Sequence, residues 1–207
     1  MNRSSGAILV LSGPSGAGKS SLINKIKDHI GAIYFSISTT TRAIRDGEVD
    51  GVHYHFVSVD TFKKDIEAEM FLEYAVVHGN YYGTSLGPVK QALKEGKLVI
   101  FDIDVQGHDA VQNRLSDITT SVFITTPTLE ELKKRLYNRS TDTDAVIEGR
   151  IEMAKREVQR ISEYDFLVVN DDLDEAAEVL ISIAKAARMK IPTLQINEFV
   201  HKWEEQS

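Results

Sequence analysis

Four short apolar runs along the chain predict buried strands. They are Ala7–Leu11, Leu98–Phe101, Ser121–Ile124 and Phe166–Val169, each followed by polar residues, glycine or proline. Nearly continuous apolar runs of this length, separated by stretches with helical spacing, are typical of parallel strands that are covered on both faces. The pattern therefore predicts an α/β fold in which a parallel β-sheet forms the middle of a three-layer core.

Helical spacing of apolar residues places helices between these strands. We expect them at residues 20–30, 86–95, 106–115, 128–136, 144–161 and 173–189. Residues 36–85 differ, because they are rich in Thr, Tyr, His and Gly and hold only short strand-like pieces at 54–57 and 71–77. We expect a small mixed α/β insertion there. Residues 191–207 form a tail whose pattern assigns it no role.

Composition narrows the functional classes. The chain has 207 residues, enough for one α/β domain with an insertion. It carries 24 Lys and Arg against 31 Asp and Glu, which argues against a nucleic-acid partner. The lack of cysteine excludes disulfides and thiol catalysis. No apolar run approaches the ~20 residues of a membrane span, so we expect a cytoplasmic protein without a membrane partner. A homo-oligomer remains compatible with the sequence.

A glycine-rich loop follows the first strand. It reads Gly13, Pro14, Ser15, Gly16, Ala17, Gly18, Lys19 and Ser20. This is the phosphate-loop (P-loop) pattern G-x-x-x-x-G-K-[ST], and it lies between a predicted strand and a predicted helix, as the motif requires. Lys19 should bridge the β- and γ-phosphates, and the Ser20 hydroxyl should bind Mg²⁺. Asp102, directly after the second strand, is the expected acid near the metal.

A second group of residues resembles an acceptor site for a phosphate. Arg42 and Arg45 stand three residues apart among hydroxyl side chains, and paired guanidinium groups suit the bidentate binding of phosphate. Tyr54 and Tyr82 can donate hydrogen bonds without adding charge. Glu73 is an acid within an apolar, strand-like piece. Taken one at a time, each is better explained as a solvated surface charge or a half-exposed glutamate than as part of a site.

In this order, the motifs resemble the guanylate kinase family. The resemblance runs from about residue 8 to about residue 187 and rests on residues 12–21, 38–51, 71–73, 79–84, 102–107 and 168–172. It implies a transferase of purine nucleotide metabolism that moves the γ-phosphate of ATP to GMP, with Mg²⁺, to give ADP and GDP.

The resemblance also implies a role for each matching position. For ATP binding it adds Ser21, Asn170 and Asp171 to the loop, and for GMP it implies Ser38, Arg42, Arg45, Tyr54, Glu73, Tyr82, Thr84 and Asp104. Elementary chemistry supports the assignment of Glu73. Guanine presents two adjacent donors, N1–H and an amine, and one carboxylate can accept from both, whereas adenine would present a lone pair.

Three arginines are candidates for stabilising the transferred phosphoryl group. Arg135, Arg139 and Arg150 lie in or beside a polar stretch that could move as a lid, and the family uses arginines there over ATP. The residues alone fit surface arginines equally well. The family usually has glycine where this chain has Ser140, which leaves the geometry of that turn open. With Lys19 and Arg42, these arginines complete the expected catalytic set.

The resemblance divides the chain into functional parts. Residues 1–35, 86–136 and 151–190 would form the nucleotide-binding core, 36–85 the GMP-binding insertion, and 137–150 a mobile lid. Two alternatives compete with an active kinase. A scaffold domain of the same family would usually have a degraded phosphate loop, and this loop is intact. A GTPase switch would need an Asn-Lys-x-Asp-type guanine motif, which the sequence lacks.

Overall fold

The structure is a computed structural model, and it describes residues 6–77, 79–138 and 143–205. Its centre is a parallel sheet with the strand order β2-β7-β1-β8-β9. The strands are β1 (Ala7–Ser12), β2 (Ile33–Phe35), β7 (Leu98–Asp102), β8 (Thr119–Thr125) and β9 (Phe166–Val169). The expected parallel α/β core is confirmed, with β2 as an additional edge strand that the apolar pattern did not predict.

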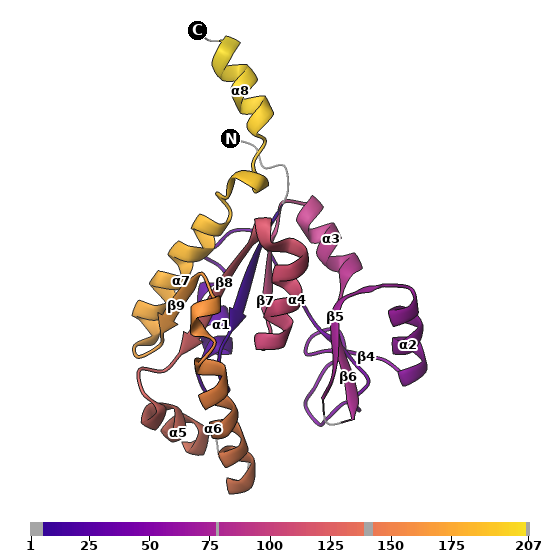
Figure 1. The fold of residues 1–207 in the computed structure, drawn as a ribbon, viewed down its shortest axis with the longest axis vertical. Helices are drawn as coiled ribbons and strands as arrows, with labels where there is room; N and C mark the ends of the chain where they lie inside the picture. Colours follow the sequence, from indigo (N-terminus) through magenta and orange to yellow (C-terminus); the bar gives the residue numbers. More distant parts are fainter. Residues whose placement is uncertain (1–5, 78, 139–142, 206–207) are drawn as a thin grey trace.

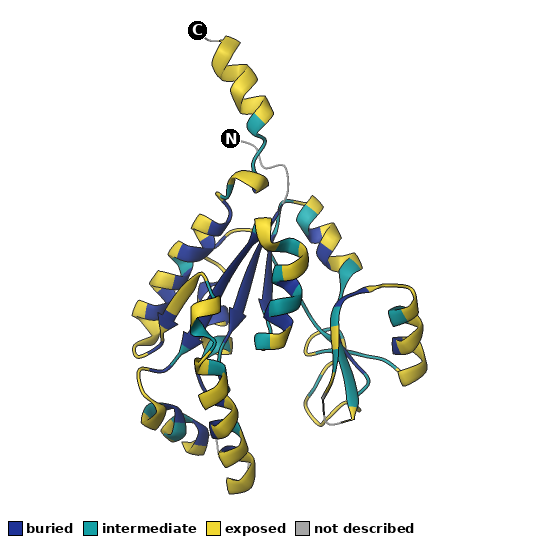
Figure 2. Ribbon diagram, viewed as in Figure 1, coloured by how far each residue is buried: buried dark blue, intermediate teal, exposed yellow. Residues whose placement is uncertain are grey.

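Helices cover both faces of this sheet (Figure 1). One face buries its side chains against α1 (Lys19–Ile26) and α7 (Leu173–Ala187), and the other against α3 (Leu86–Lys94) and α4 (Val105–Leu115). All six residues of β1 are buried, and Figure 2 shows the same for the middle of the sheet. Helix α1 ends earlier than expected, because the His29 N–H bonds to the Ile26 carbonyl three residues back and so tightens the last turn.

The insertion has a sheet of its own with the strand order β4-β3-β6-β5. The strands are β3 (Thr39–Thr40), β4 (His55–Phe56), β5 (Phe71–Val77) and β6 (Asn80–Ser85), and α2 (Val59–Glu67) packs beside them. Helix α2 was not predicted, because Phe62 is its one buried residue. The Phe62 ring stacks on Phe71 at 4.3 Å between ring centroids, which attaches the helix to β5.

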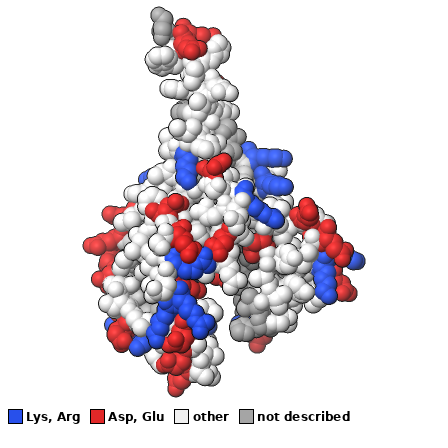
Figure 3. Space-filling view, in the orientation of Figure 1, with Lys and Arg blue, Asp and Glu red and all other residues white. Residues whose placement is uncertain are grey.

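Helices α5 (Leu129–Asn138) and α6 (Asp144–Val158) pack against each other around a small apolar cluster of their own. Figure 1 places this pair on the opposite side of the core from the insertion. Figure 3 shows a hollow between the two parts, at the end of the sheet to which β1 and β7 point.

The chain continues past α7 through two short elements. A 3₁₀ turn at Ile191–Thr193 leads into α8 (Ile196–Glu205), which extends away from the rest of the molecule (Figure 1). Two further 3₁₀ turns lie at Ser116–Ile118 and Ile161–Glu163. Within the described ranges, none of the helices combines the length and apolar character that crossing a membrane requires.

Candidate functional site

The glycine-rich loop connects β1 to α1 in a conformation that only glycine tolerates easily. Gly13 and Gly18 have φ values of 142° and 89°. A Cβ atom on Gly13 would lie 1.9 Å from the Ile124 carbonyl oxygen of β8, and one on Gly18 would lie 2.2 Å from Asn170 Nδ2. The loop is therefore wedged between the end of β8 and Asn170, and these contacts fix its path.

Lys19 begins α1 and folds back over this loop. Its Nζ donates to the Gly13 carbonyl oxygen at 2.6 Å and lies 3.7 Å from Asp102 Oδ1. Burial raises the pKa of Asp102, and the charge of Lys19 opposes that shift. Asp102 ends β7, the strand beside β1, so the parallel register brings the acid to the loop. The structure thus places the expected lysine and the expected acid together.

Two oxygen-bearing side chains line one cavity at the position expected for a metal ion. Ser20 and Asp102 line one cavity of about 620 Å³, which Tyr54 of the insertion also lines. A hydroxyl and a carboxylate are ligands of the kind that Mg²⁺ prefers. The donor set therefore fits that ion. Ser21 lies exposed in the same first turn of α1.

Asn170 and Ser15 tie the loop to later parts of the chain. Asn170 is only 3% exposed and donates from Nδ2 to the Ala17 carbonyl oxygen at 2.8 Å, so its amide supports the loop from beneath. The neighbouring Asp171 is exposed. Arg150 of α6 donates to the Ser15 hydroxyl at 2.9 Å, which brings that arginine to the loop from the α5–α6 side.

Most of the residues expected to bind GMP line a second cavity. It measures about 520 Å³ and lies between the insertion and the start of α4. Those in its lining are Ser38, Tyr54, Glu73, Tyr82 and Asp104, together with Asp102, which was expected near the metal; the expected Arg42, Arg45 and Thr84 are not part of the lining. Asp102 and Tyr54 line both cavities, so the cavity that holds the expected metal ligands Ser20 and Asp102 is adjacent to the expected GMP site.

Glu73 is a half-buried acid in the lining of this second cavity. It lies on β5, opposite Thr84 of β6 in the register of the antiparallel pair. Thr84 is buried and donates its hydroxyl to Glu73 Oε1 at 2.7 Å. Burial raises the pKa of Glu73, the Thr84 hydrogen bond opposes this, and the charge of Asp104 adds to it. The carboxylate has lone pairs beyond the one that Thr84 uses, and these can accept from a ligand.

The two arginines of the insertion have different surroundings. The Arg42 guanidinium lies over the Tyr54 ring, at 5.4 Å from its centroid, and makes a bidentate pair with Glu48. These hydrogen bonds are the largest cause that lowers the pKa of Glu48 to about 2. Arg45 is exposed, and its backbone N–H donates to the same carboxylate at 2.8 Å. Sequence reasoning gave Glu48 no role, because an acid after a turn glycine resembles any solvated side chain.

Two of the three lid candidates lie in the described part of the chain. Arg150 reaches the loop, while Arg135 Nε donates to Glu131 Oε1 on its own helix at 2.8 Å. Arg139 and Ser140 lie outside the described residues, so expectations about them stay predictions. Sequence reasoning also missed Glu157, two helical turns after Arg150. Burial raises its pKa, Lys19 lowers it and Asp104 raises it, so the carboxylate lies near both.

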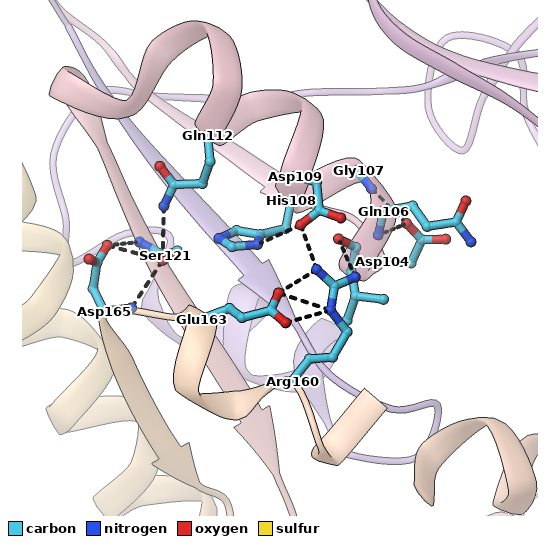
Figure 4. Close-up of polar contacts among 11 residues, drawn as sticks. Asp104, Gln106, Gly107, His108, Asp109, Gln112, Ser121, Arg160, Glu163 and Asp165 are labelled. Atoms are coloured by element: carbon cyan, nitrogen blue, oxygen red, sulfur yellow. Dashed lines mark hydrogen bonds and ion pairs between the residues drawn. The ribbon is translucent and has the colours of Figure 1, made fainter. Parts of the chain in front are cut away.

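The base of α6 is joined to the start of α4 by Arg160 (Figure 4). Its guanidinium donates to Asp109 Oδ1 at 2.6 Å, and it also pairs with Glu163. At the same turn Asp104 caps α4, accepting from the backbone N–H of residues 106 and 107. His108, Asp109 and Glu163 are close enough to suit a metal ion. The guanidinium already pairs with both carboxylates, so Arg160 takes the place of a cation there.

Comparison with known proteins gives one consistent result. The guanylate kinase family model matches residues 5–187. The chain is 74% identical to a guanylate kinase of Sulfurimonas denitrificans, over 99% of this chain and all of that protein, and 53% identical to one of Wolinella succinogenes, over 98% and 94%. The crystal structure of guanylate kinase from Anaplasma phagocytophilum superposes with a TM-score of 0.74, at 31% identity and over 93% of this chain and 92% of that one.

Proposed function

The chain belongs to the guanylate kinase family, and we propose that it transfers the γ-phosphate of ATP to GMP, giving ADP and GDP. The observation that carries this proposal is the sharing of Asp102 and Tyr54 between the cavity beside the phosphate loop and the cavity that holds Glu73. A phosphate loop whose expected metal ligands lie next to a cavity suited to a guanine nucleotide is what a phosphoryl transfer between nucleotides needs. A scaffold domain would not require such a loop.

The donor ATP binds through residues 13–21. Backbone N–H groups of the loop and the N-terminal end of α1 favour the negative charge of the phosphates. Lys19 then exchanges its contact with the Gly13 carbonyl for the β- and γ-phosphate oxygens. Ser20 and Asp102 would hold Mg²⁺, which when bound neutralises charge on the phosphates. Asn170 keeps the loop in shape from beneath, and Asp171 lies next to it.

The acceptor GMP binds in the insertion. Glu73 accepts from N1–H and the amine of guanine, and Thr84 and Ser38 complete the contacts with the base. Arg42, Arg45, Tyr54 and Tyr82 donate to the phosphate, with Asp104 nearby. No strong general base is needed, because a phosphate oxygen of GMP is itself the nucleophile. Catalysis is therefore positioning and charge neutralisation.

The α5–α6 pair closes the site during transfer. Arg150 already contacts the loop through Ser15, and Arg135 and Arg139 lie on the same part of the chain. Closing this part over ATP would add positive charge around the moving phosphoryl group and exclude water, which would otherwise hydrolyse ATP. Residues 137–150 are the segment that we assign to this lid.

A coupled assay of ADP release tests the proposal. We expect ADP to form from ATP when GMP is present, and GDP to appear in equal amount. Lys19→Ala should lower kcat by at least about 1,000-fold, because it removes a positive charge from the transition state. Its melting temperature should stay near that of the wild type. Binding of both nucleotides without turnover by the wild type would favour the scaffold instead, and hydrolysis of GTP alone would favour a switch.

A further inference from the structure

One carboxylate organises the arginine loop of the insertion. Glu48 Oε1 accepts from Arg42 Nη2 at 2.6 Å, and Oε2 accepts from Arg42 Nη1 at 3.0 Å and from the Arg45 backbone N–H at 2.8 Å. The Glu48 N–H in turn donates to the Arg45 carbonyl at 3.0 Å. Gly47, with φ 82°, provides the turn that brings Glu48 back to both arginines. The loop from Arg42 to Glu48 is thus closed by Glu48.

The contacts of Arg42 leave one edge of its guanidinium for a ligand. A guanidinium has five N–H donors in a fixed plane. Nη1 donates to Glu48 and to the Ala43 carbonyl oxygen, and Nη2 donates once to Glu48, so these contacts use three of the five donors, and the Tyr82 hydroxyl also lies within reach of the guanidinium. The other two lie on Nε and Nη2, which form the second fork of the group. A fork of this kind binds two oxygens of a phosphate.

The surroundings of Arg42 allow little freedom in its orientation. The side chains of Arg42 and Glu48 are 12% and 18% exposed. The guanidinium lies over the rings of Tyr54 and Phe56, at 5.4 and 5.7 Å from their centroids. The pKa of Arg42 is raised, first by its hydrogen bonds to Glu48 and also by the Tyr82 hydroxyl, which therefore lies close to the guanidinium.

We propose that Glu48 is a positioning residue, which orients the Arg42 guanidinium so that its second fork faces the phosphate of GMP. The inference rests on the proposed function, since it takes GMP as the acceptor. The proposal predicts a change in GMP affinity whose direction is opposite to the one that simple electrostatics predicts. Removing a negative charge near a phosphate site should tighten phosphate binding, whereas removing Glu48 should weaken it, because Arg42 is then free to rotate.

The test compares Glu48→Gln with Asp46→Asn. Both variants remove one negative charge from the same loop, but Asp46 is exposed and takes no part in the arginine contacts described above. Equilibrium binding by calorimetry would use GMP, guanosine and ATP as separate ligands. In Glu48→Gln the Kd of GMP should rise about 10- to 100-fold, the range expected when hydrogen bonds to a charged group are lost. The Kd values of guanosine and ATP should change by less than about twofold, since neither uses Arg42.

Asp46→Asn should bind GMP as tightly as the wild type or slightly more tightly. High salt should abolish any such gain in Asp46→Asn but should not abolish the weaker GMP binding of Glu48→Gln. Glu48→Asp, which keeps the charge on a shorter side chain, should recover part of the affinity for GMP. Equal weakening of GMP and guanosine in Glu48→Gln would overturn the inference, because the residue would then support the whole pocket. So would GMP affinity equal to that of Asp46→Asn. If the wild type itself failed to bind GMP, the proposed function would fall as well, so the two failures are distinguishable.

Discussion

Replacing Glu73 by glutamine tests how the second cavity recognises guanine. The substitution keeps the size of the side chain and removes its charge. The glutamine carbonyl can still accept from the Thr84 hydroxyl, as Glu73 Oε1 does now at 2.7 Å. Its NH₂ group then points at the two donors of guanine, N1–H and the amine, where a carboxylate oxygen accepted before. We therefore expect Glu73→Gln to weaken GMP binding and to leave ATP binding unchanged.

The expected magnitude follows from the hydrogen bonds that are lost. A hydrogen bond to a charged group contributes roughly 1.5–3 kcal/mol, and guanine can make two to Glu73. Glutamine can rotate its amide so that Thr84 accepts from NH₂ and guanine meets the oxygen, because a hydroxyl can serve either way. This recovers one of the two contacts, so the net loss should be about 1.5–3 kcal/mol. That corresponds to a GMP Kd about 10- to 150-fold higher.

The assay measures binding of GMP, IMP and ATP to the wild type, to Glu73→Gln and to a matched control. Glu67→Gln is the control, since it makes the same change at an exposed position at the end of α2. IMP lacks the exocyclic amine, so the wild type should prefer GMP over IMP by about 10- to 100-fold and Glu73→Gln should lose most of this preference. Equal losses for GMP and ATP, or an unchanged preference for GMP over IMP, would refute the reasoning.

The raised pKa of Glu73 adds a pH dependence with a definite sign. The pKa in the folded protein lies above the ordinary value of 4.5. Between these two values the folded state binds more protons than the unfolded state, so the free energy of unfolding falls as pH rises through this window. Without ligand, Glu73→Gln should therefore melt above the wild type at neutral pH, and the difference should shrink below pH ~4.5. GMP binding by the wild type should weaken as pH falls through the same window.

Two further variants test the loop and the closing helices. Gly18→Ala should lower the free energy of unfolding by more than about 2 kcal/mol and raise the KM for ATP, because the φ of Gly18 is 89° and an added Cβ would lie 2.2 Å from Asn170 Nδ2. The control Gly96→Ala, at φ 71° with open space around it, should lose only about 1 kcal/mol. Equal melting temperatures for the two variants would contradict the account of the loop. Arg150→Ala should lower kcat by at least about tenfold with little change in the KM for GMP, since it removes a charge that acts mainly in the transition state. The control is Arg156→Ala, at an exposed position on the same helix, and its kcat should match that of the wild type.

The fold was predictable where apolar residues occur in runs. The strand at residues 166–169 and the strand at 71–77 were both expected within the bounds that the structure gives. Strand β2 was missed because three residues are too few to show a pattern, and it is held mainly by pairing with β7. Helix α8 was missed for another reason. None of its residues is buried against the core, although Ile196, Phe199, Val200 and Trp203 repeat at helical spacing, a signal that the sequence analysis did not use.

The site was predictable where a residue belongs to a local motif. Lys19 and Asp102 were expected near each other, because Lys19 belongs to the phosphate-loop motif and Asp102 ends a neighbouring predicted strand. Glu48 and Glu157 carry no such signal. Helix α6 bears several acids, and only the folded arrangement distinguishes Glu157, which lies near Lys19 and Asp104, from its exposed neighbour Glu152. Contacts between residues that are far apart in the sequence follow no fixed spacing, so sequence patterns do not reveal them.

The distribution of charge gives a reason for closure to depend on substrate. Asp102 lies 3.7 Å from Lys19, and the charge of Lys19 also lowers the pKa of Glu157, so acidic groups already offset part of the positive charge of Lys19. The phosphates of two nucleotides add further negative charge, which Lys19 alone does not offset. In the proposed transfer, a bound metal ion, Arg135 and Arg150, which already contacts the loop through Ser15, would supply the difference. We therefore expect substrate binding to favour lid closure through the same electrostatic free energy that lowers the barrier to transfer.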